Sequence, residues 1–378
     1  MSTTAAKLNE EVLNPMKQRF VGKDEIIDLL GVSLVAGENL FILGPPGTAK
    51  SALVQDVATR IEGRVFDYLL TRFTEPNELF GPFDIRKLRE GELITNTQGM
   101  LPEAELVFLD ELLNANSAIL NSLLMVLNER VFRRGRESKN LPLLMVVGAS
   151  NRLPEDEALG ALFDRFLLRV LCDNVESELL RDVLDAGWLI EQKQEIAGSD
   201  LSIEDLRKLQ RAVAKVDLAK IRTAFVELVH RLRHAGIQIS DRRAVKLQRP
   251  IAASALLCGR DYAIQSDLWI MRYIWDTREQ QELLAEIVND VIKKRDDDES
   301  HHARSTFMNS PNPEAIAREL SNIGKRLKGD SIQEHDKIYL RDRVSLLASR
   351  TQWVSNDQQR AALEKRVSKL WDALGIQD

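Results

Sequence analysis

The feature that most constrains this chain is a short apolar run that meets a glycine- and proline-rich turn and then a lysine and a serine. It reads Phe41-Ile42-Leu43-Gly44-Pro45-Pro46-Gly47-Thr48-Ala49-Lys50-Ser51. The apolar run fits a buried parallel strand, whereas the glycines and prolines cannot continue one. Apolar residues after Lys50 recur on a helical period. Such a strand, turn and helix point backbone N–H groups and the positive end of a helix dipole at one spot, which suits a polyphosphate.

The turn fits the phosphate-loop pattern G-x-x-x-x-G-K-[ST] except at Ala49, where the pattern has a glycine. We expect the Ala49 methyl group to be accommodated through a negative φ. Lys50 is expected to reach the β- and γ-phosphates, and the Ser51 hydroxyl to ligate Mg²⁺. A chance turn before a helix is the alternative interpretation, and the strand before the turn counts against it. The predicted phosphate-binding residues are Gly44, Pro45, Pro46, Gly47, Thr48, Ala49, Lys50 and Ser51.

Polar residues follow two further apolar runs, at 106–109 and 144–147. The first run ends in Asp110-Glu111, and the carboxyl ends of parallel strands are where ligands bind. Asp110 is expected to hold Mg²⁺ opposite Ser51, and Glu111 to orient and deprotonate the attacking water. Two solvated acids after a strand would look the same in isolation. Asn151 follows the second run and could bond the γ-phosphate or the lytic water, although Ser-Asn is also ordinary loop chemistry.

The order of elements predicts an α/β domain with a parallel sheet and helices on both faces. Alternating segments between 85 and 100, around Glu90-Gly91, predict an inserted β-hairpin. A basic turn then precedes the strand at 143–147; we favour a solvated hairpin tip, with contact to a substrate or nucleic acid as the alternative. Its arginines are Arg133, Arg134 and Arg136. The expected strands are 41–43, 64–71, 105–109, 143–147 and 167–171.

From about residue 176 the strand pattern gives way to helical periods. Ser202-x-x-Asp205 begins one helix, and Ser240 is the expected N-cap of another that Pro250 kinks or ends. We therefore expect an α/β nucleotide-binding domain over 1–190, an all-α lid over 191–277 and a helical bundle over 278–378. His301-His302 closes a charged run that we expect to be a solvated linker, with metal binding as the alternative.

Net charge, cysteine content and the length of the apolar runs count against several classes of function. The chain has 378 residues and a net charge of −6, which argues against generic nucleic-acid binding. Its two cysteines, Cys172 and Cys258, form no disulfide framework by spacing, so a reducing cytoplasm is expected. No apolar run reaches about 18 residues, and no signal-peptide core precedes the first helix, so no membrane span is expected.

The order of these segments resembles an AAA+ ATPase, and the core sequence resembles the MoxR family, closest to its RavA branch. The resemblance covers roughly residues 15–275, and the C-terminal region shows no counterpart of the β-rich insertion that RavA carries. It rests on the phosphate loop with its alanine and on these further segments: Thr71-Arg72-Phe73-Thr74-Glu75-Pro76, Leu79-Phe80-Gly81-Pro82, Leu101-Pro102-Glu103-Ala104-Glu105, Phe108-Leu109-Asp110-Glu111, Leu127-Asn128-Glu129-Arg130 and Ser240-Asp241-Arg242-Arg243.

The resemblance implies roles for several residues. Asn151 would be the first sensor, and Arg165 the arginine finger that reaches a neighbouring subunit's γ-phosphate. Arg242 would be the second sensor, with Arg243 as the alternative. The implied cofactors are ATP and Mg²⁺, and the 85–100 insertion would sit near the pore of a ring. The implied function is ATP hydrolysis by a self-associating ring, expected to be a hexamer. The ring would act as a chaperone-like remodelling factor for protein clients, often with a von Willebrand factor A-domain partner.

Three other functions stay open at this point. Nucleic-acid motors share this AAA+ clade, although the acidic net charge counts against one here. A GTP-dependent switch would need an Asn-Lys-x-Asp element for guanine, which the expected position lacks. The ATPase subunit of a magnesium-chelatase-like metal-insertion system would look similar in sequence.

Overall fold

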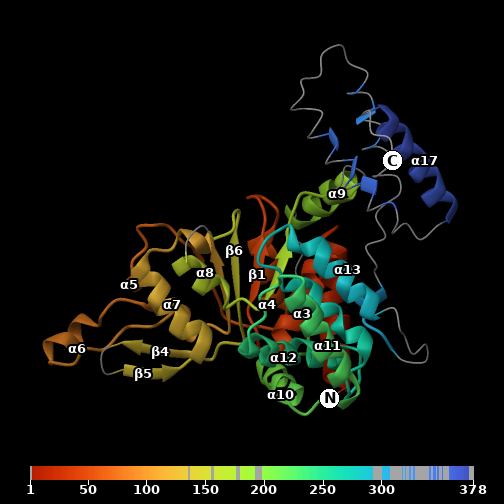
Figure 1. Cartoon of the computed structure of the whole chain (residues 1–378). Helices are drawn as coiled ribbons and strands as arrows, with labels where there is room; N and C mark the ends of the chain where they lie inside the picture. The colour runs from red at the N-terminus through yellow and green to blue at the C-terminus, as the bar shows by residue number, and fades with distance from the viewer. Residues whose placement is uncertain are drawn as a thin grey trace. The chain divides into compact units, whose positions relative to one another are not determined.

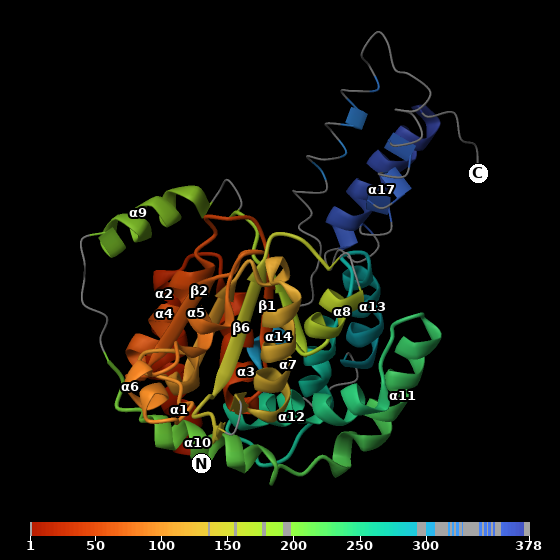
Figure 2. The ribbon, with the colours of Figure 1, turned by 90° about the vertical axis from the view of Figure 1, so that its left-hand side faces the viewer.

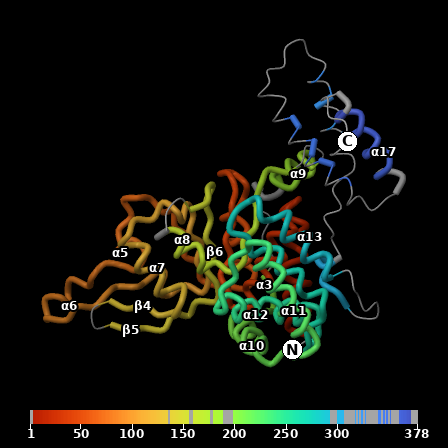
Figure 3. Tube along the Cα trace, viewed as in Figure 1, coloured from red at the N-terminus to blue at the C-terminus, as the bar shows by residue number. Residues whose placement is uncertain are grey.

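The computed structural model describes residues 2–134, 137–154, 157–175, 179–191, 198–292, 300–306 and 357–373, together with short stretches between 317 and 351. Their contacts form two compact units, Met1–Thr306 and Phe307–Asp378. Figure 1 shows the elements of both units, and Figure 3 follows the course of the chain. The site lies in the first unit.

The first unit is built on a five-stranded parallel sheet, as the sequence predicts, in the order β2-β3-β6-β1-β7. Its central strands are almost fully buried, which explains their unbroken apolar runs. All five predicted strands are present, with ends shifted by a few residues. They are β1 (Leu40–Leu43), β2 (Val65–Leu69), β3 (Leu106–Asp110), β6 (Met145–Ser150) and β7 (Leu168–Leu171).

Helices cover both faces of this sheet. Helices α3 (Asp24–Ala36) and α4 (Lys50–Arg60) pack on one face, α3 over β1 and β7 and α4 over β2 and β3. Helices α7 (Ser117–Glu129) and α8 (Glu157–Phe163) lie on the other face, as Figures 1 and 2 show from two directions. The predicted α/β class is therefore confirmed.

The hairpin predicted between 85 and 100 is wrong. Residues Ile85–Arg89 form helix α6, whose N-cap Asp84 accepts hydrogen bonds from the backbone N–H groups of Arg86 and Lys87. Only one isolated antiparallel bridge, Phe83 to Thr95, joins the two sides of this segment. An N-cap aspartate followed by good helix formers favours a helical turn over a strand.

The hairpin lies instead at β4 (Val131–Arg134) and β5 (Glu137–Asn140), which pair antiparallel. The basic turn is only partly the solvated tip that we expected. The Arg134 guanidinium donates to the Gly81 carbonyl at 2.8 Å and to Asn77 Oδ1 at 2.5 Å, and it lies 3.9 Å from the Phe83 ring centroid. Arg136 lies outside the described residues. The hairpin is therefore tied to α5 (Pro76–Phe80).

The second half of this unit is helical, as predicted, and Ser202 and Ser240 are N-caps. Pro250 does not end its helix, which continues to Leu257. The helices are α9 (Leu180–Glu191), α10 (Ile203–Val213), α11 (Arg222–His234), α12 (Asp241–Leu257), the 3₁₀ helix η6 (Gln265–Tyr273) and α13 (Gln280–Ile292). Of these helices, α10 and α12 pack against α3 and the N-terminal helix α1 (Ser2–Lys7). Asn9 of the π-helix η1 (Leu8–Leu13), which precedes α2 (Asn14–Arg19), donates to the Leu257 carbonyl at the end of α12 at 2.8 Å.

Most of the charged run expected to be a solvated linker, residues 295–299, lies outside the described residues. The segment 300–306, which contains α14 (Ala303–Thr306), packs against η6. The His302 ring stacks on buried Trp269, with ring centroids 4.6 Å apart. Arg304 Nε lies 2.7 Å from Asp28 Oδ2. Over the described part of the chain, no three His, Cys, Asp or Glu side chains gather as metal ligands. His302 therefore has a packing role. The acidic residues beside the histidine pair, at 296–299, lie outside the described residues, so the metal-binding alternative stays a prediction.

The second unit has a small core of its own, to which α17 (Asp357–Ala373) contributes Leu363, Val367 and Leu370. The other predicted tail helices fall largely outside the described residues. None of the described helices in either unit combines the length and the apolar character needed to cross a membrane.

Candidate functional site

The phosphate loop leaves β1 at a point where two strands constrain its backbone. The Gly44 N–H donates to the Ser150 carbonyl at 2.9 Å, and a Cβ on Gly44 would lie 2.2 Å from the Cys172 carbonyl oxygen. Only glycine fits that approach. The loop then closes on itself, because Thr48 Oγ1 donates to the Pro45 carbonyl at 2.9 Å.

Lys50 lies inside this loop. Its ammonium group donates to the Gly44 and Pro45 carbonyls at 3.1 and 2.8 Å, and the side chain is buried. Ala49 precedes it with φ 66° and ψ 23°, so the expected negative φ is wrong. The methyl group is accepted in the left-handed region that glycine usually occupies, which costs about 1–2 kcal/mol.

Asp110 and Glu111 stand at the carboxyl end of β3. The Glu111 N–H donates to Asp110 Oδ1 at 2.9 Å, and Glu111 itself has φ 49°. A left-handed non-glycine residue stores strain, which clusters at functional sites. Burial and the Asp110 carboxylate raise the pKa of Glu111, while the charges of Lys50 and Arg152 partly offset the rise. The acidic pair and the loop lysine therefore share one electrostatic environment.

Asn151 comes directly after Ser150, the last residue of β6. Because the Ser150 carbonyl accepts the hydrogen bond from the Gly44 N–H, Asn151 lies at the same edge of the sheet as the phosphate loop. Its neighbour Arg152 belongs to the site as well, although no sequence pattern pointed to it. The Arg152 guanidinium donates to Asn114 Oδ1 at 3.0 Å and lowers the pKa of Glu111. Its position next to Asn151 was the available signal.

Arg165 lies at the opposite edge. Its carbonyl accepts a hydrogen bond of 3.1 Å from Asn39 Nδ2, and Asn39 precedes β1, whereas Gly44 follows β1. At about 3.3 Å per residue, Asn39 and Gly44 are roughly 16 Å apart. The Arg165 Nε is buried and has no hydrogen-bond partner within the described chain.

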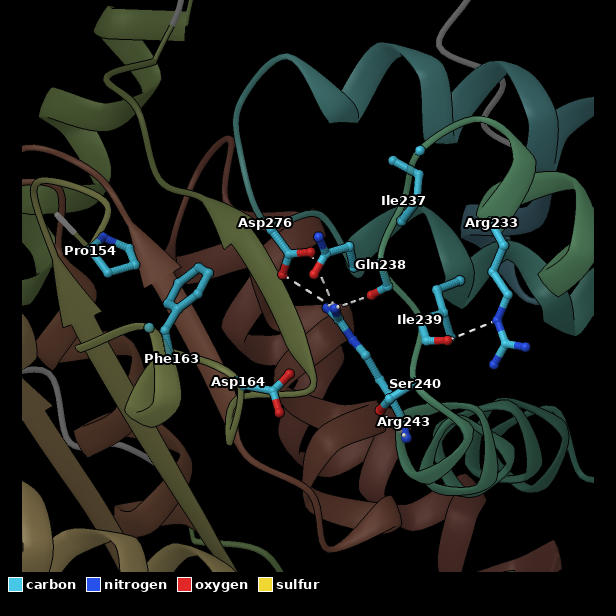
Figure 4. A pocket seen from close by; sticks show the side chains of 12 residues that line it. Pro154, Phe163, Asp164, Arg233, Ile237, Gln238, Ile239, Ser240, Arg243 and Asp276 are labelled. Carbon is cyan, nitrogen blue, oxygen red and sulfur yellow. Dashed lines mark hydrogen bonds and ion pairs between the residues drawn. The ribbon is translucent and has the colours of Figure 1, made fainter. Parts of the chain in front are cut away.

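Arg242 and Arg243 both lie away from the loop. Arg242 is exposed and donates to Asn128 Oδ1 at 3.3 Å, near the end of α7. Arg243 is buried; it donates to the Ile274 carbonyl at 2.5 Å and lies 3.2 Å from Asp276 Oδ1. Figure 4 shows the Arg243 side chain in a pocket of about 860 Å³, with Asp276 and Gln238 at its tip.

This pocket adjoins the Arg165 turn, because Phe163 and Asp164 line it together with Arg243. The predicted site residues thus form two groups. The loop, Asp110, Glu111 and Asn151 share the carboxyl edge of the sheet, and the three predicted arginines lie on the other side.

The carboxyl-edge group fits a Mg²⁺ nucleotide. No side chain caps the N-terminus of α4, and its first turn contains no acidic residue. The N–H groups of that turn are therefore left for an anion. Ser51 is half-buried in the same turn, and Asp110 supplies the hard oxygen ligand that Mg²⁺ prefers. Next to this edge, Lys23 Nζ donates to the Asp173 carbonyl at 2.6 Å, which brings the 21–23 turn to the chain after β7.

Comparisons with known proteins place the chain in a family. A family model described as the MoxR domain in the MoxR-vWA-beta-propeller ternary systems matches residues 6–211, and an AAA lid domain model matches residues 216–288. Uncharacterized protein MJ0812 of Methanocaldococcus jannaschii is 37% identical over 268 residues, which are 70% of each chain. Chaperone MoxR1 of Mycobacterium tuberculosis is 25% identical over 68% of this chain and 72% of its own.

A crystal structure from Cytophaga hutchinsonii has the same fold, with a TM-score of 0.62 and 18% identity over 78% of this chain and 96% of that chain. The MoxR-domain model alone matches more than half of the sequence, and the lid model continues from it. The chain therefore belongs to the MoxR family of AAA+ ATPases.

Proposed function

We propose that this protein hydrolyses ATP with Mg²⁺ at a site that two neighbouring copies complete. Copies would assemble into a ring, with six as the expected number, and use the cycle as a chaperone-like remodelling or assembly factor for protein complexes. The family supports the general class, since one relative is named a chaperone.

One observation carries the shared site. The residues that would bind the nucleotide and the arginine that would act on its γ-phosphate lie at opposite edges of one sheet, roughly 16 Å apart along β1. One arginine side chain does not bridge that distance. Stacking one copy's Arg165 edge on the next copy's loop edge would bring them together, and a repeated head-to-tail contact of this kind closes into a ring.

Within this site each residue has a separate task. Lys50 and the N–H groups at the start of α4 would bind the β- and γ-phosphates. Ser51 and Asp110 would hold Mg²⁺, which neutralises charge on the phosphates when bound. Glu111 would take a proton from the attacking water, and Asn151 would orient that water. Arg165 of the adjacent copy would stabilise the charge that develops in the transition state.

The arginines of the helical half would act from the same edge as Arg165. The family resemblance implies Arg242 as the second sensor, but its exposed side chain points to Asn128 near the end of α7. Arg243 lines the pocket beside the Arg165 turn, and this favours Arg243 for the role. The lid would then act on the neighbouring copy's nucleotide.

The partner is proposed from the family. The matched model is described from systems that pair a MoxR domain with a von Willebrand factor A-domain and a β-propeller protein. We infer that a von Willebrand factor A-domain protein is this chain's partner and helps select the client. We also propose that the chain belongs to the RavA branch of the family and that it is located in the cytoplasm.

The experiment is an assay of phosphate release from Mg-ATP at increasing protein concentration, with the mass measured by light scattering with and without ATP. We expect a specific activity that rises with concentration together with a ring-sized species. A rate that is independent of concentration, from a monomer, would refute the shared site and leave only a phosphate-loop hydrolase.

A further inference from the structure

Arg169 is a fully buried arginine on the edge strand β7, and the sequence analysis gave it no role. An arginine is rarely buried in a strand unless its five donors find partners. Here the partners come from two directions. One set belongs to the end of α8, and the other follows η6 in the helical half.

On the first side, Arg169 holds the turn that carries Arg165. Its Nη2 donates to the Phe163 carbonyl at 3.2 Å, and its guanidinium lies 4.0 Å from the Phe163 ring centroid. The same carbonyl accepts from the Phe166 N–H at 3.0 Å, which closes the turn around Arg165. The position of the Arg165 backbone therefore depends on a carbonyl that Arg169 helps to fix.

On the second side, Arg169 holds the segment that carries Arg243. Its Nη1 donates to the Trp275 carbonyl at 2.6 Å and to Asp276 Oδ1 at 2.5 Å. Arg243 binds the same Asp276 carboxylate at 3.2 Å and the Ile274 carbonyl at 2.5 Å. One carboxylate thus lies between two guanidinium groups, and it is one-third exposed toward the pocket.

The charge state of this cluster follows from its surroundings. Burial and the nearby Arg243 lower the pKa of Arg169 to about 9, so the guanidinium remains charged at neutral pH. The carboxylates of Asp276 and Asp164, which both line the pocket, oppose the two guanidinium charges. The Nη atoms of both arginines are hydrogen-bonded, whereas the buried Nε atoms of Arg169 and Arg243 have no partner within the described chain. Breaking the ion pairs of such a buried cluster is costly.

We propose that Arg169 is a positioning residue that holds the Arg165 turn and Arg243 in one rigid block, so that both arginines meet the neighbouring copy's nucleotide together. This inference rests on the proposed shared site.

The test is Arg169→Lys, which keeps the charge but loses the planar fork. That fork binds the three acceptors above and the Ile274 carbonyl at 3.3 Å. We expect equilibrium ATP affinity to stay at the wild-type value, because the loop lies at the other edge. The turnover number should fall about 10- to 100-fold, as expected for a catalytic group displaced by about 1 Å. Arg222→Lys, at an exposed arginine on α11, is the matched control and should leave both values unchanged.

Mixing distinguishes positioning from general damage. Subunits with Arg169→Lys keep an intact loop, and Lys50→Ala subunits keep an intact arginine block. A mixture should regain hydrolysis to the same extent as an Arg165→Ala and Lys50→Ala mixture. Wild-type turnover by Arg169→Lys, or no recovery in its mixture while the Arg165→Ala mixture recovers, would overturn the positioning role.

If neither mixture recovers, the shared site itself fails, and this inference fails with it. Should Arg169→Lys not fold, Asp276→Asn replaces it, because it weakens the same network at a one-third exposed acceptor. The same pattern of normal affinity, low turnover and recovery in the mixture is expected. Its absence would count against the proposal.

Discussion

The side-chain amide of Asn39 donates a hydrogen bond of 3.1 Å to the backbone carbonyl of Arg165. This bond fixes Arg165 at the amino edge of the sheet, one strand length away from the loop that follows β1. Arg130 strengthens the arrangement, because its Nη2 donates to Asn39 Oδ1 at 2.8 Å. The fold of one chain therefore keeps the loop lysine Lys50 and the candidate arginine finger Arg165 apart.

Lys50→Ala should weaken ATP binding by about 10- to 100-fold, because it removes a charge-assisted bond to phosphate worth about 1.5–3 kcal/mol. Titration calorimetry measures the affinity directly. Lys215→Ala, at an exposed lysine, is the control and should bind normally. If Lys50→Ala bound ATP with wild-type affinity, the segment 44–51 would not be the phosphate-binding loop.

Glu111→Gln should bind ATP normally but hydrolyse it about 10²- to 10⁴-fold more slowly, the usual contribution of a general base. Single-turnover measurements separate this chemical step from nucleotide binding and product release. Unchanged single-turnover hydrolysis would exclude Glu111 as the base.

The pH dependence of hydrolysis should reflect the same residue. Burial and the Asp110 carboxylate raise the pKa of Glu111 above its ordinary value of 4.5. A base works in its deprotonated form, so the rate should fall as pH drops through that raised pKa. Asp110→Asn removes the repulsion and should shift the acidic limb of the residual activity to lower pH. If the acidic limb of the pH–rate profile moved to higher pH in Asp110→Asn, the Asp110 carboxylate would not be what raises the pKa of Glu111.

Ala49→Gly should stabilise the protein slightly. The substitution removes the strain of an alanine in the left-handed region, which costs the folded state about 1–2 kcal/mol. The greater freedom of glycine in the unfolded chain takes back about 0.5–1 kcal/mol of that gain. Urea unfolding measures the difference. Ala224→Gly, inside helix α11, is the matched control and should destabilise by about 1 kcal/mol. Equal losses in both variants would contradict the strain at Ala49.

His302 should make the stability of the first unit depend on pH. Burial lowers its pKa to about 4 from 6.5, and its Nδ1 accepts the Arg304 backbone N–H at 3.1 Å, which requires the neutral ring. The unfolded chain binds the extra proton between these values, so stability should decrease as pH falls from about 6.5 to 4. The slope is at most about 1.4 kcal/mol per pH unit.

His302→Phe keeps an aromatic ring against Trp269 and removes the titrating group. Its free energy of unfolding should be lower at neutral pH, because the bond to the Arg304 N–H is lost. It should also vary less between pH 4 and 6.5 than that of the wild type. An unchanged pH profile would assign the dependence to other groups.

The sequence predicted the sheet and the loop-edge residues because their signals are local. β1 and β3 are apolar runs that end directly in Gly44 and Asp110, so strand, turn and chemistry are adjacent in the chain. Parallel pairing then brings their carboxyl ends to one edge without further information. The same logic placed Asn151 after β6.

The features that the sequence did not predict depend on contacts between distant parts of the chain or on a single backbone angle. The stacking of His302 on Trp269 and the burial of Arg169 depend on contacts between distant segments. The sign of φ at Ala49 is set by how tightly the loop closes, which composition does not reveal. The missed helix α6 had a readable signal in its N-cap Asp84, but the Glu90-Gly91 turn pattern outweighed it.

The most direct test of the shared site mixes Lys50→Ala and Arg165→Ala proteins, each expected to be nearly inactive alone. Arg165→Ala should bind ATP and lose about 10³- to 10⁵-fold in rate. At equal amounts, about one interface in four of a randomly mixed ring pairs an intact loop with an intact arginine, so about a quarter of the wild-type rate should return. No recovery at any ratio would contradict a site that two copies share.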